Sequence, residues 1–91
     1  MTLDQNYPNP FSQSTKINFT LPSSTKISLK VFDVLGREVQ VLDQGMKEAG
    51  SYSIRFGKNE SEKTMTLAKG VYYYTLSTGE QNITRKMMLM E

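Results

Sequence analysis

The chain closes on the stretch that decides its fold, Gly70-Val71-Tyr72-Tyr73-Tyr74-Thr75-Leu76-Ser77-Thr78-Gly79-Glu80-Gln81-Asn82-Ile83-Thr84-Arg85-Lys86-Met87-Met88-Leu89-Met90-Glu91. Residues 71–76 are rich in tyrosine and β-branched residues, which favour a strand. Residues 77–80 predict a tight turn in which Gly79 is free to take a positive φ. Residues 83–90 then return as a second strand. Because chain ends are usually polar and frayed, this apolar end is expected to dock on the rest of the domain.

Upstream of this hairpin, apolar and polar residues alternate with the period of two that is typical of half-buried strands. The alternation predicts strands at residues 16–21, 26–31, 37–42 and 50–56, with a further short strand at residues 64–67. The side chains expected to point into a core are those of Ile17, Phe19, Leu21, Ile27, Leu29, Val31, Tyr52, Ile54 and Phe56.

Turn and loop signals separate these strands. Asp33-Val34-Leu35-Gly36 has Asp at the first and Gly at the last position of a type I turn, so it is expected to close a hairpin with a glycine bulge. Gly45 and Gly50 favour a loop over residues 43–49. The polar residues 57–63 predict an exposed loop.

The N-terminal part of the chain contains two X-Pro pairs, in the run Tyr7-Pro8-Asn9-Pro10-Phe11. Each proline restricts the residue before it to extended geometry and lacks the N–H that a central strand needs. The run is therefore expected to lie along one edge of the domain, held there by Tyr7 and Phe11.

Six or seven short strands, with turn signals about 8–12 residues apart and no helical period, predict an all-β fold, an antiparallel β-sandwich of two sheets. A tyrosine corner supports this fold. In Leu67-x-x-Gly70-x-Tyr72, a tyrosine follows a glycine turn just inside a strand, where its hydroxyl is expected to bond to backbone a few residues upstream.

Composition excludes most catalytic and metal-binding chemistry. The 91 residues form one domain and contain neither cysteine nor histidine. Disulfides, thiol catalysis, a Ser-His-Asp triad and nearly every zinc site are thereby excluded. Asp4, Asn6 and Asn9 lack the spacing of a calcium loop, so they are expected to serve turns and caps. We expect no enzyme, no catalytic or metal-binding residue, and no cofactor.

The charge pattern argues against nucleic acid as a partner. The net charge is only +2, and the lysines are scattered along the chain instead of being clustered. No apolar run approaches the length of a membrane helix, and the first residues do not resemble a signal peptide. The protein is therefore either cytoplasmic or a piece of a longer precursor.

Several runs, taken in order, carry a family resemblance. They are Asn6-Tyr7-Pro8-Asn9-Pro10-Phe11, Thr15-Lys16-Ile17-Asn18-Phe19, Leu21-Pro22, the stretch from Lys30 to Val39 that includes Gly36, Ala49-Gly50, Gly70-Val71-Tyr72-Tyr73-Tyr74 and the tail Arg85-Lys86-Met87-Met88-Leu89-Met90. Together they resemble the type A C-terminal sorting domains of the type IX secretion system of Bacteroidota and related bacteria. The pattern is also similar to the Ig-like domain of the flagellar hook-capping protein.

The resemblance implies an Ig-like sandwich of about seven strands at the C-terminus of a larger secreted precursor. It implies a sorting signal that directs an N-terminal cargo domain, after transit through the periplasm, across the outer membrane to the medium or the cell surface. The implied partners are outer-membrane components of the type IX system and a sortase-like cysteine protease that removes the domain and attaches the cargo to an anionic lipopolysaccharide. No small-molecule substrate is implied.

The resemblance also assigns roles to individual residues. Recognition by the secretion machinery is expected at Gly70, Tyr72, Gly79, Arg85, Lys86, Met87, Met88, Leu89 and Met90, whereas Tyr7, Pro8, Asn9, Pro10, Phe11 and Gly36 are expected to be structural. The chain departs from the family in a longer, more charged stretch at residues 57–67 and in ending on Glu91 instead of a basic residue.

The expected mode of recognition is strand addition. The last strand is predicted to lie at a sheet edge, where unpaired backbone groups would accept a strand of a partner, with Arg85 and Lys86 supplying a charge match. The alternative function is a non-catalytic structural or adhesive Ig-like module, either hook-cap-like or a spacer beside a catalytic domain.

Overall fold

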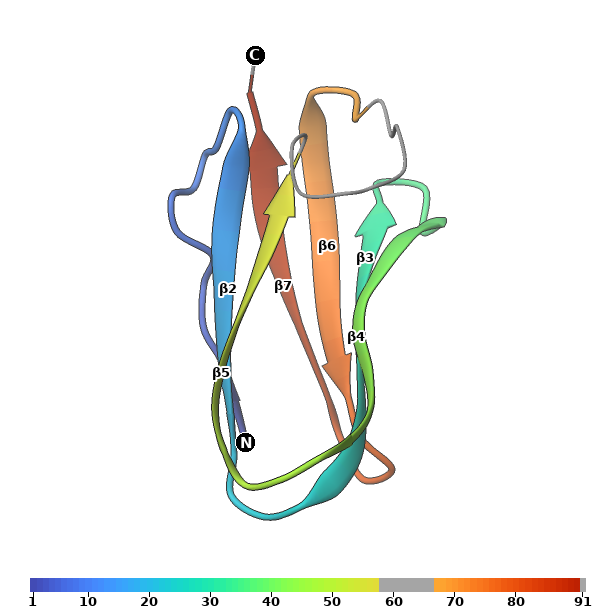
Figure 1. Ribbon diagram of the computed structural model, residues 1–91. Helices are drawn as coiled ribbons and strands as arrows, with labels where there is room; N and C mark the ends of the chain where they lie inside the picture. Colours follow the sequence, from blue (N-terminus) through green and yellow to red (C-terminus); the bar gives the residue numbers. More distant parts are fainter. Residues whose placement is uncertain (58–66, 91) are drawn as a thin grey trace.

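The computed structural model describes residues 1–57 and 67–90. Over these residues the chain forms antiparallel strands in two sheets and no helix (Figure 1). The strands are β1 (Thr2–Leu3), β2 (Ser14–Leu21), β3 (Thr25–Asp33), β4 (Glu38–Lys47), β5 (Gly50–Gly57), β6 (Gly70–Ser77) and β7 (Asn82–Leu89). The all-β sandwich expected from the sequence is confirmed.

One sheet has the order β1-β2-β5 and the other the order β4-β3-β6-β7. The core lies between them, because alternate residues of each strand point inward, as the period of two predicts. The inward faces expected for β2 and β3 are confirmed, whereas Tyr52 and Ile54 of β5 are only partly buried. The buried apolar side chains are those of Leu3, Phe11, Ile17, Phe19, Leu21, Ile27, Leu29, Val31, Phe56, Leu67, Tyr72, Tyr74, Leu76, Met87 and Leu89.

The loop expected over residues 43–49 is wrong, because β4 continues to Lys47. Gly45 lies inside the strand, opposite Ile27, with a φ of 116°. Pairing with the long β3 therefore overrides the local loop signal of the glycines.

The strand expected at residues 64–67 and most of the loop expected at 57–63 lie outside the described residues; Leu67 itself is buried and belongs to no strand.

The hairpin turn at Asp33 to Gly36 is confirmed. Gly36 has a φ of 83°, and its N–H donates to the Asp33 carbonyl over 3.0 Å. The Asp33 carboxylate accepts from the backbone N–H groups of Leu35 and Arg37, each over 2.9 Å. The bond from the Arg37 N–H is the main cause of the lowered pKa of Asp33.

The turn between β6 and β7 is built differently from the expectation, because Gly79 does not have a positive φ. Thr78 shapes it instead. Its hydroxyl accepts from the backbone N–H groups of Glu80 and Gln81, each over 3.2 Å, and its own N–H donates to the Gln81 carbonyl over 2.9 Å. A threonine side chain thus supplies the turn chemistry that was expected of the glycine.

Two tyrosines of β6 connect the sheets to neighbouring backbone. The hydroxyl of Tyr72 donates to the Ala68 carbonyl, which confirms the tyrosine corner. The fully buried Tyr74 donates to the Asp4 carbonyl over 2.7 Å and accepts from the Asn6 N–H over 2.8 Å. Tyr74 therefore holds the N-terminal part of the chain against the four-stranded sheet.

Replacing Tyr74 with Phe should destabilise the domain by about 1–3 kcal/mol, because the buried Asn6 N–H loses its acceptor. Urea unfolding would measure the loss. Tyr73→Phe, at a partly exposed position on the same strand, is the matched control and should stay within about 0.5 kcal/mol of the wild type. A Tyr74→Phe variant as stable as this control would contradict the role given to the hydroxyl.

The domain should also lose stability in alkali. Burial raises the pKa of Tyr72 and of Tyr74 above the ordinary value of 10.0. Below pH 10 both states keep the phenol protons; as the pH rises further, the unfolded chain ionises first and stability falls. Between about pH 9 and 11, on either side of the ordinary tyrosine pKa, the free energy of unfolding should fall less steeply with pH in a Tyr72→Phe/Tyr74→Phe double variant than in the wild type. Equal slopes would contradict the prediction.

Candidate recognition surface at the C-terminal strand

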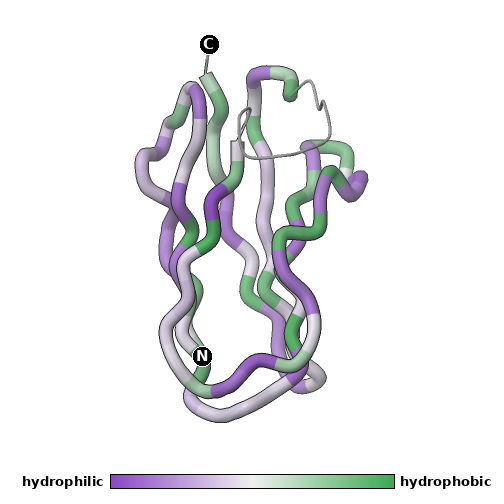
Figure 2. Tube along the Cα trace, in the orientation of Figure 1, coloured by the Kyte–Doolittle hydropathy of each residue, from purple (hydrophilic) through white to green (hydrophobic). Residues whose placement is uncertain are grey.

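The last strand is divided between the core and the surface. Met87 and Leu89 of β7 are buried, while Lys86, Met88 and Met90 point outward, with Met88 44% and Met90 51% exposed. Figure 2 shows the hydrophobic colouring of this last part of the strand beside the C-terminus. The expectation that the apolar chain end docks on the domain is confirmed, and docking leaves every second residue exposed.

The free edge of β7 is covered by the N-terminal segment, residues 4–11. The Phe11 N–H donates to the Met88 carbonyl over 2.9 Å, and the Met90 N–H donates to the Phe11 carbonyl over 2.7 Å. The Asn9 side-chain oxygen accepts from the Met88 N–H over 3.0 Å, and the Gln5 amide donates to the Lys86 carbonyl over 2.6 Å. The backbone groups that point outward near the end of β7 therefore have partners within the chain.

This finding corrects the expected mode of recognition. Strand addition needs unpaired backbone groups at an edge, but the hydrogen bonds of the N-terminal segment occupy the Lys86 carbonyl, both backbone groups of Met88 and the Met90 N–H. Arg85 is engaged as well, because its Nε donates to the Leu3 carbonyl. What β7 offers to a partner in this part of the domain is a set of side chains.

Buried polar and aromatic groups hold the N-terminal segment in place. Phe11 packs edge-to-face on Phe56, with ring centroids 6.2 Å apart. The buried Asn6 amide donates to the Thr15 hydroxyl over 2.9 Å and to the Pro8 carbonyl over 3.1 Å, and both X-Pro bonds are cis. Tyr7 pairs with β2 through its backbone, but its side chain is 81% exposed. Both residues thus hold the segment as expected, Phe11 through its ring and Tyr7 through its backbone.

The remaining predicted recognition residues lie in different places. Tyr72 is buried in the core with its hydroxyl at the corner. Gly70, with a φ of 140°, pairs with Leu89, and together with Lys69, Met88 and Met90 these two residues line a groove of about 560 Å³. A Cβ added at Gly70 would meet no heavy atom within 4 Å, so the reason for glycine here is the backbone, whose φ is one that L side chains rarely adopt.

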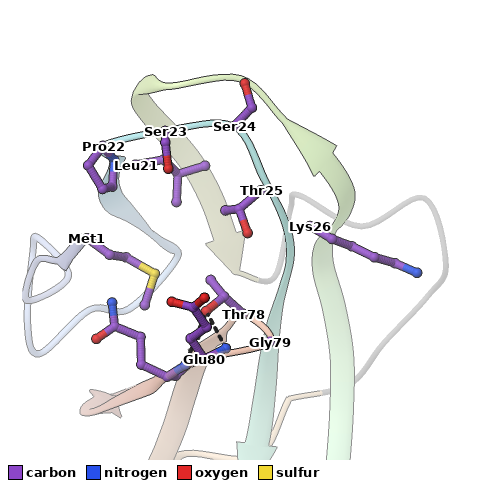
Figure 3. A pocket seen from close by; sticks show the side chains of 11 residues that line it. Met1, Leu21, Pro22, Ser23, Ser24, Thr25, Lys26, Thr78, Gly79 and Glu80 are labelled. Carbon is purple, nitrogen blue, oxygen red and sulfur yellow. Dashed lines mark hydrogen bonds between the residues drawn. The ribbon is translucent and has the colours of Figure 1, made fainter.

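Gly79 lies at the other end of the hairpin. The pairing runs from Gly70 opposite Leu89 to Ser77 opposite Asn82, so the turn is about 23 Å from the exposed methionines at a rise of about 3.3 Å per residue. There it lines a polar hollow of 410 Å³ with Met1, the β2–β3 turn and the ends of the flanking strands (Figure 3). The structure does not bring Gly79 together with Lys86 or Met88.

The structure adds exposed residues that the sequence analysis did not single out. Tyr73 lies directly opposite Lys86, and Val71 lies directly opposite Met88, so all four side chains are on the outward face of the sheet. The strand period could have indicated this, because positions 71 and 73 alternate with the buried Tyr72 and Tyr74. The arrangement provides an exposed surface of apolar side chains with Lys86 among them.

Within residues 1–57 and 67–90, no group of three His, Cys, Asp or Glu side chains is placed to hold a metal ion. The same residues contain no helix that could cross a membrane.

The family comparison covers almost the whole chain. The family described as secretion system C-terminal sorting domain matches residues 5–90, from the N-terminal segment to the exposed end of the last strand. No curated protein and no solved structure matches the chain. The match extends over far more than half of the sequence and confirms the resemblance. The chain belongs to the family of secretion system C-terminal sorting domains, the sorting signals of type IX secretion.

Proposed function

We propose that this domain is the C-terminal end of a larger precursor and that outer-membrane components of the type IX system bind it from the periplasm. The cargo precedes the domain and crosses the inner membrane by an N-terminal signal. After translocation, a sortase-like cysteine protease removes the domain, and the cargo is released or attached at the cell surface. The domain contributes binding alone and no catalytic residue.

The observation that carries this proposal is the division of β7 into buried and exposed side chains. Met87 and Leu89 fix the strand in the core, while Lys86, Met88 and Met90 stay accessible to a partner. A signal built in this way is recognised as a folded surface, because the accessible side chains keep their relative positions only while the strand is docked.

The proposed roles of the remaining residues follow from their surroundings. Gly70 lines the groove beside Met88, and Tyr72 supports β6 through the corner hydrogen bond. Arg85 connects β7 to Leu3 of β1. Gly79 belongs to a hollow at the far end of the domain, so we assign it no contact with the same partner surface.

Support for a preceding cargo comes from the positions of the termini. The N- and C-termini lie at opposite ends of the sandwich (Figure 1), and Met1 lies in the hollow beside the β6–β7 turn. A cargo joined at Met1 would therefore extend from the end that is farthest from Met88 and Met90. The proposed recognition surface would stay uncovered in the precursor.

The test is a secretion assay in a type IX-competent bacterium. The domain is fused behind an N-terminal signal and a fluorescent reporter, and the fraction of reporter outside the cells is measured. Lys86→Ala should lower that fraction about tenfold, as expected for the loss of about 1.4 kcal/mol of binding free energy. A chain stopped after Thr84 should leave the reporter in the periplasm.

The matched control is Lys26→Ala, because Lys26 is also exposed on the outward face of the same sheet but near the opposite end. This variant should be secreted like the wild type, and circular dichroism should show that both lysine variants are folded. Equal secretion of the Lys86→Ala and wild-type fusions would refute the role of Lys86. Secretion of the truncated chain would favour the alternative of a structural or spacer module.

A further inference from the structure

The outward face of the four-stranded sheet carries a connected group of exposed side chains near the C-terminus. Phe32 of β3, Tyr73 of β6 and Lys86 of β7 lie side by side across three strands, and Val71 lies opposite Met88 in the next pair. These five residues are called the outer patch below. Phe32 and Val71 are partly exposed, and Tyr73 is 36% exposed.

The surface of the outer patch is hollowed on two sides of Met88. One hollow, of about 560 Å³, extends toward Gly70 and Met90, and the other, of about 160 Å³, is bordered by Val71, Lys86 and Pro10 of the N-terminal segment. Exposed apolar side chains gathered beside concave surface are characteristic of sites that bind another protein.

On β6 and β7, the apolar character of the outward face is confined to the end that carries the outer patch. One pair further along, Thr75 and Thr84 are opposite each other and share a hydrogen bond of 2.8 Å. Beyond them lie Ser77 and Asn82, again as a pair. A sheet face that only contacts water is expected to be polar along its full length. The exposed apolar side chains at this end are therefore not explained by solvation alone.

The charge of the outer patch indicates the chemistry of its partner. Lys30 and Glu38, its nearest charged neighbours on β3 and β4, form an ion pair of 3.3 Å, and Asp33 pairs with Arg37 over 2.8 Å. Lys86 takes part in no salt bridge within the described residues. The patch and the groove beside it therefore present positive charge, from Lys86 and Lys69, beside apolar groups, which carboxylates beside an apolar surface would complement.

We propose that the outer patch docks by its side chains on a protein of the export apparatus whose contact surface is an apolar depression bordered by carboxylates. The inference rests on the proposed function for the location of that partner. Contact through side chains follows from the covered edge of β7, where the N-terminal segment already bonds to the backbone of Met88 and Met90.

Two other occupants fit the patch less well. Membrane surfaces attract clusters of about four to eight basic residues, whereas the outer patch contains Lys86 and the groove beside it Lys69. A second copy of this chain, docked about a two-fold axis through the patch, would bring the two Lys86 side chains together and add repulsion. A protein partner with the opposite charge meets neither obstacle.

The experiment uses the same reporter fusion with four patch variants. The double variant Tyr73→Thr/Met88→Thr removes apolar surface but keeps residue types that favour strands. It should lower the secreted fraction about tenfold or more, because a few central side chains dominate the binding energy of such interfaces. Lys86→Glu should lower secretion more than Lys86→Gln does. Lys86→Arg should be secreted like the wild type because the charge is kept.

The controls are Met46→Thr and Lys26→Glu, at paired positions near the opposite end of the same outward face, where Met46 is 70% exposed. Both should be secreted normally, and urea unfolding should show that all variants are folded. If the wild-type fusion stays in the periplasm, the proposed function fails and this inference with it. If the wild type is secreted and the folded patch variants are secreted equally well, this inference alone is overturned.

Two measurements on the isolated domain test the kind of partner. Sedimentation with phosphatidylglycerol vesicles should show no binding, and light scattering at micromolar concentration should show a monomer. Binding to vesicles that is lost in Tyr73→Thr/Met88→Thr would identify a membrane as the occupant and overturn the proposal. A dimer that this double variant dissociates would overturn it in favour of a second copy of the chain.

Discussion

The buried hydroxyl of Tyr74 is the contact on which the rest of the structure depends. It lies in the middle of β6 and bonds to the backbone of Asp4 and Asn6, 70 and 68 positions away in the sequence. This contact holds residues 4–11 against the sheet, and from there Phe11 and Asn9 reach the edge of β7. Fixing the last strand in the core in turn determines which of its side chains are exposed. One phenol group therefore connects the core to the recognition surface.

Sequence reasoning found what local patterns specify. The alternation in β2 and β3 identified the inward side chains, because both strands are buried on one face and solvated on the other. The Asp33 turn and the Tyr72 corner were also found, since each depends on residues four or fewer positions apart. Pairing between distant strands has no such local signal. For this reason β4 was ended too early at its glycine, and the chemistry of the β6–β7 turn was assigned to Gly79 instead of Thr78.

The candidate site was predicted in part for the same reason. The family pattern treated the consecutive residues Lys86, Met87, Met88 and Leu89 as one set, whereas the pleat divides them between surface and core. Tyr73 was missed because the family pattern singles out Tyr72, although the strand period places the residue after Tyr72 on the opposite, outward face. The covered edge could not have been predicted, since it depends on side chains such as Gln5 and Asn9 that bond to backbone about 80 residues away.

The contact between Phe11 and the last strand has a consequence for biosynthesis. Phe11 pairs with Leu89 and bonds to Met90, so these contacts of the N-terminal segment can form only after β7 has been synthesised. A precursor whose synthesis stops early can still contain a complete cargo, but its C-terminal domain lacks β7 and leaves Phe11 without its partner. The pairing of these two segments thus makes complete folding of the domain depend on the synthesis of its last strand.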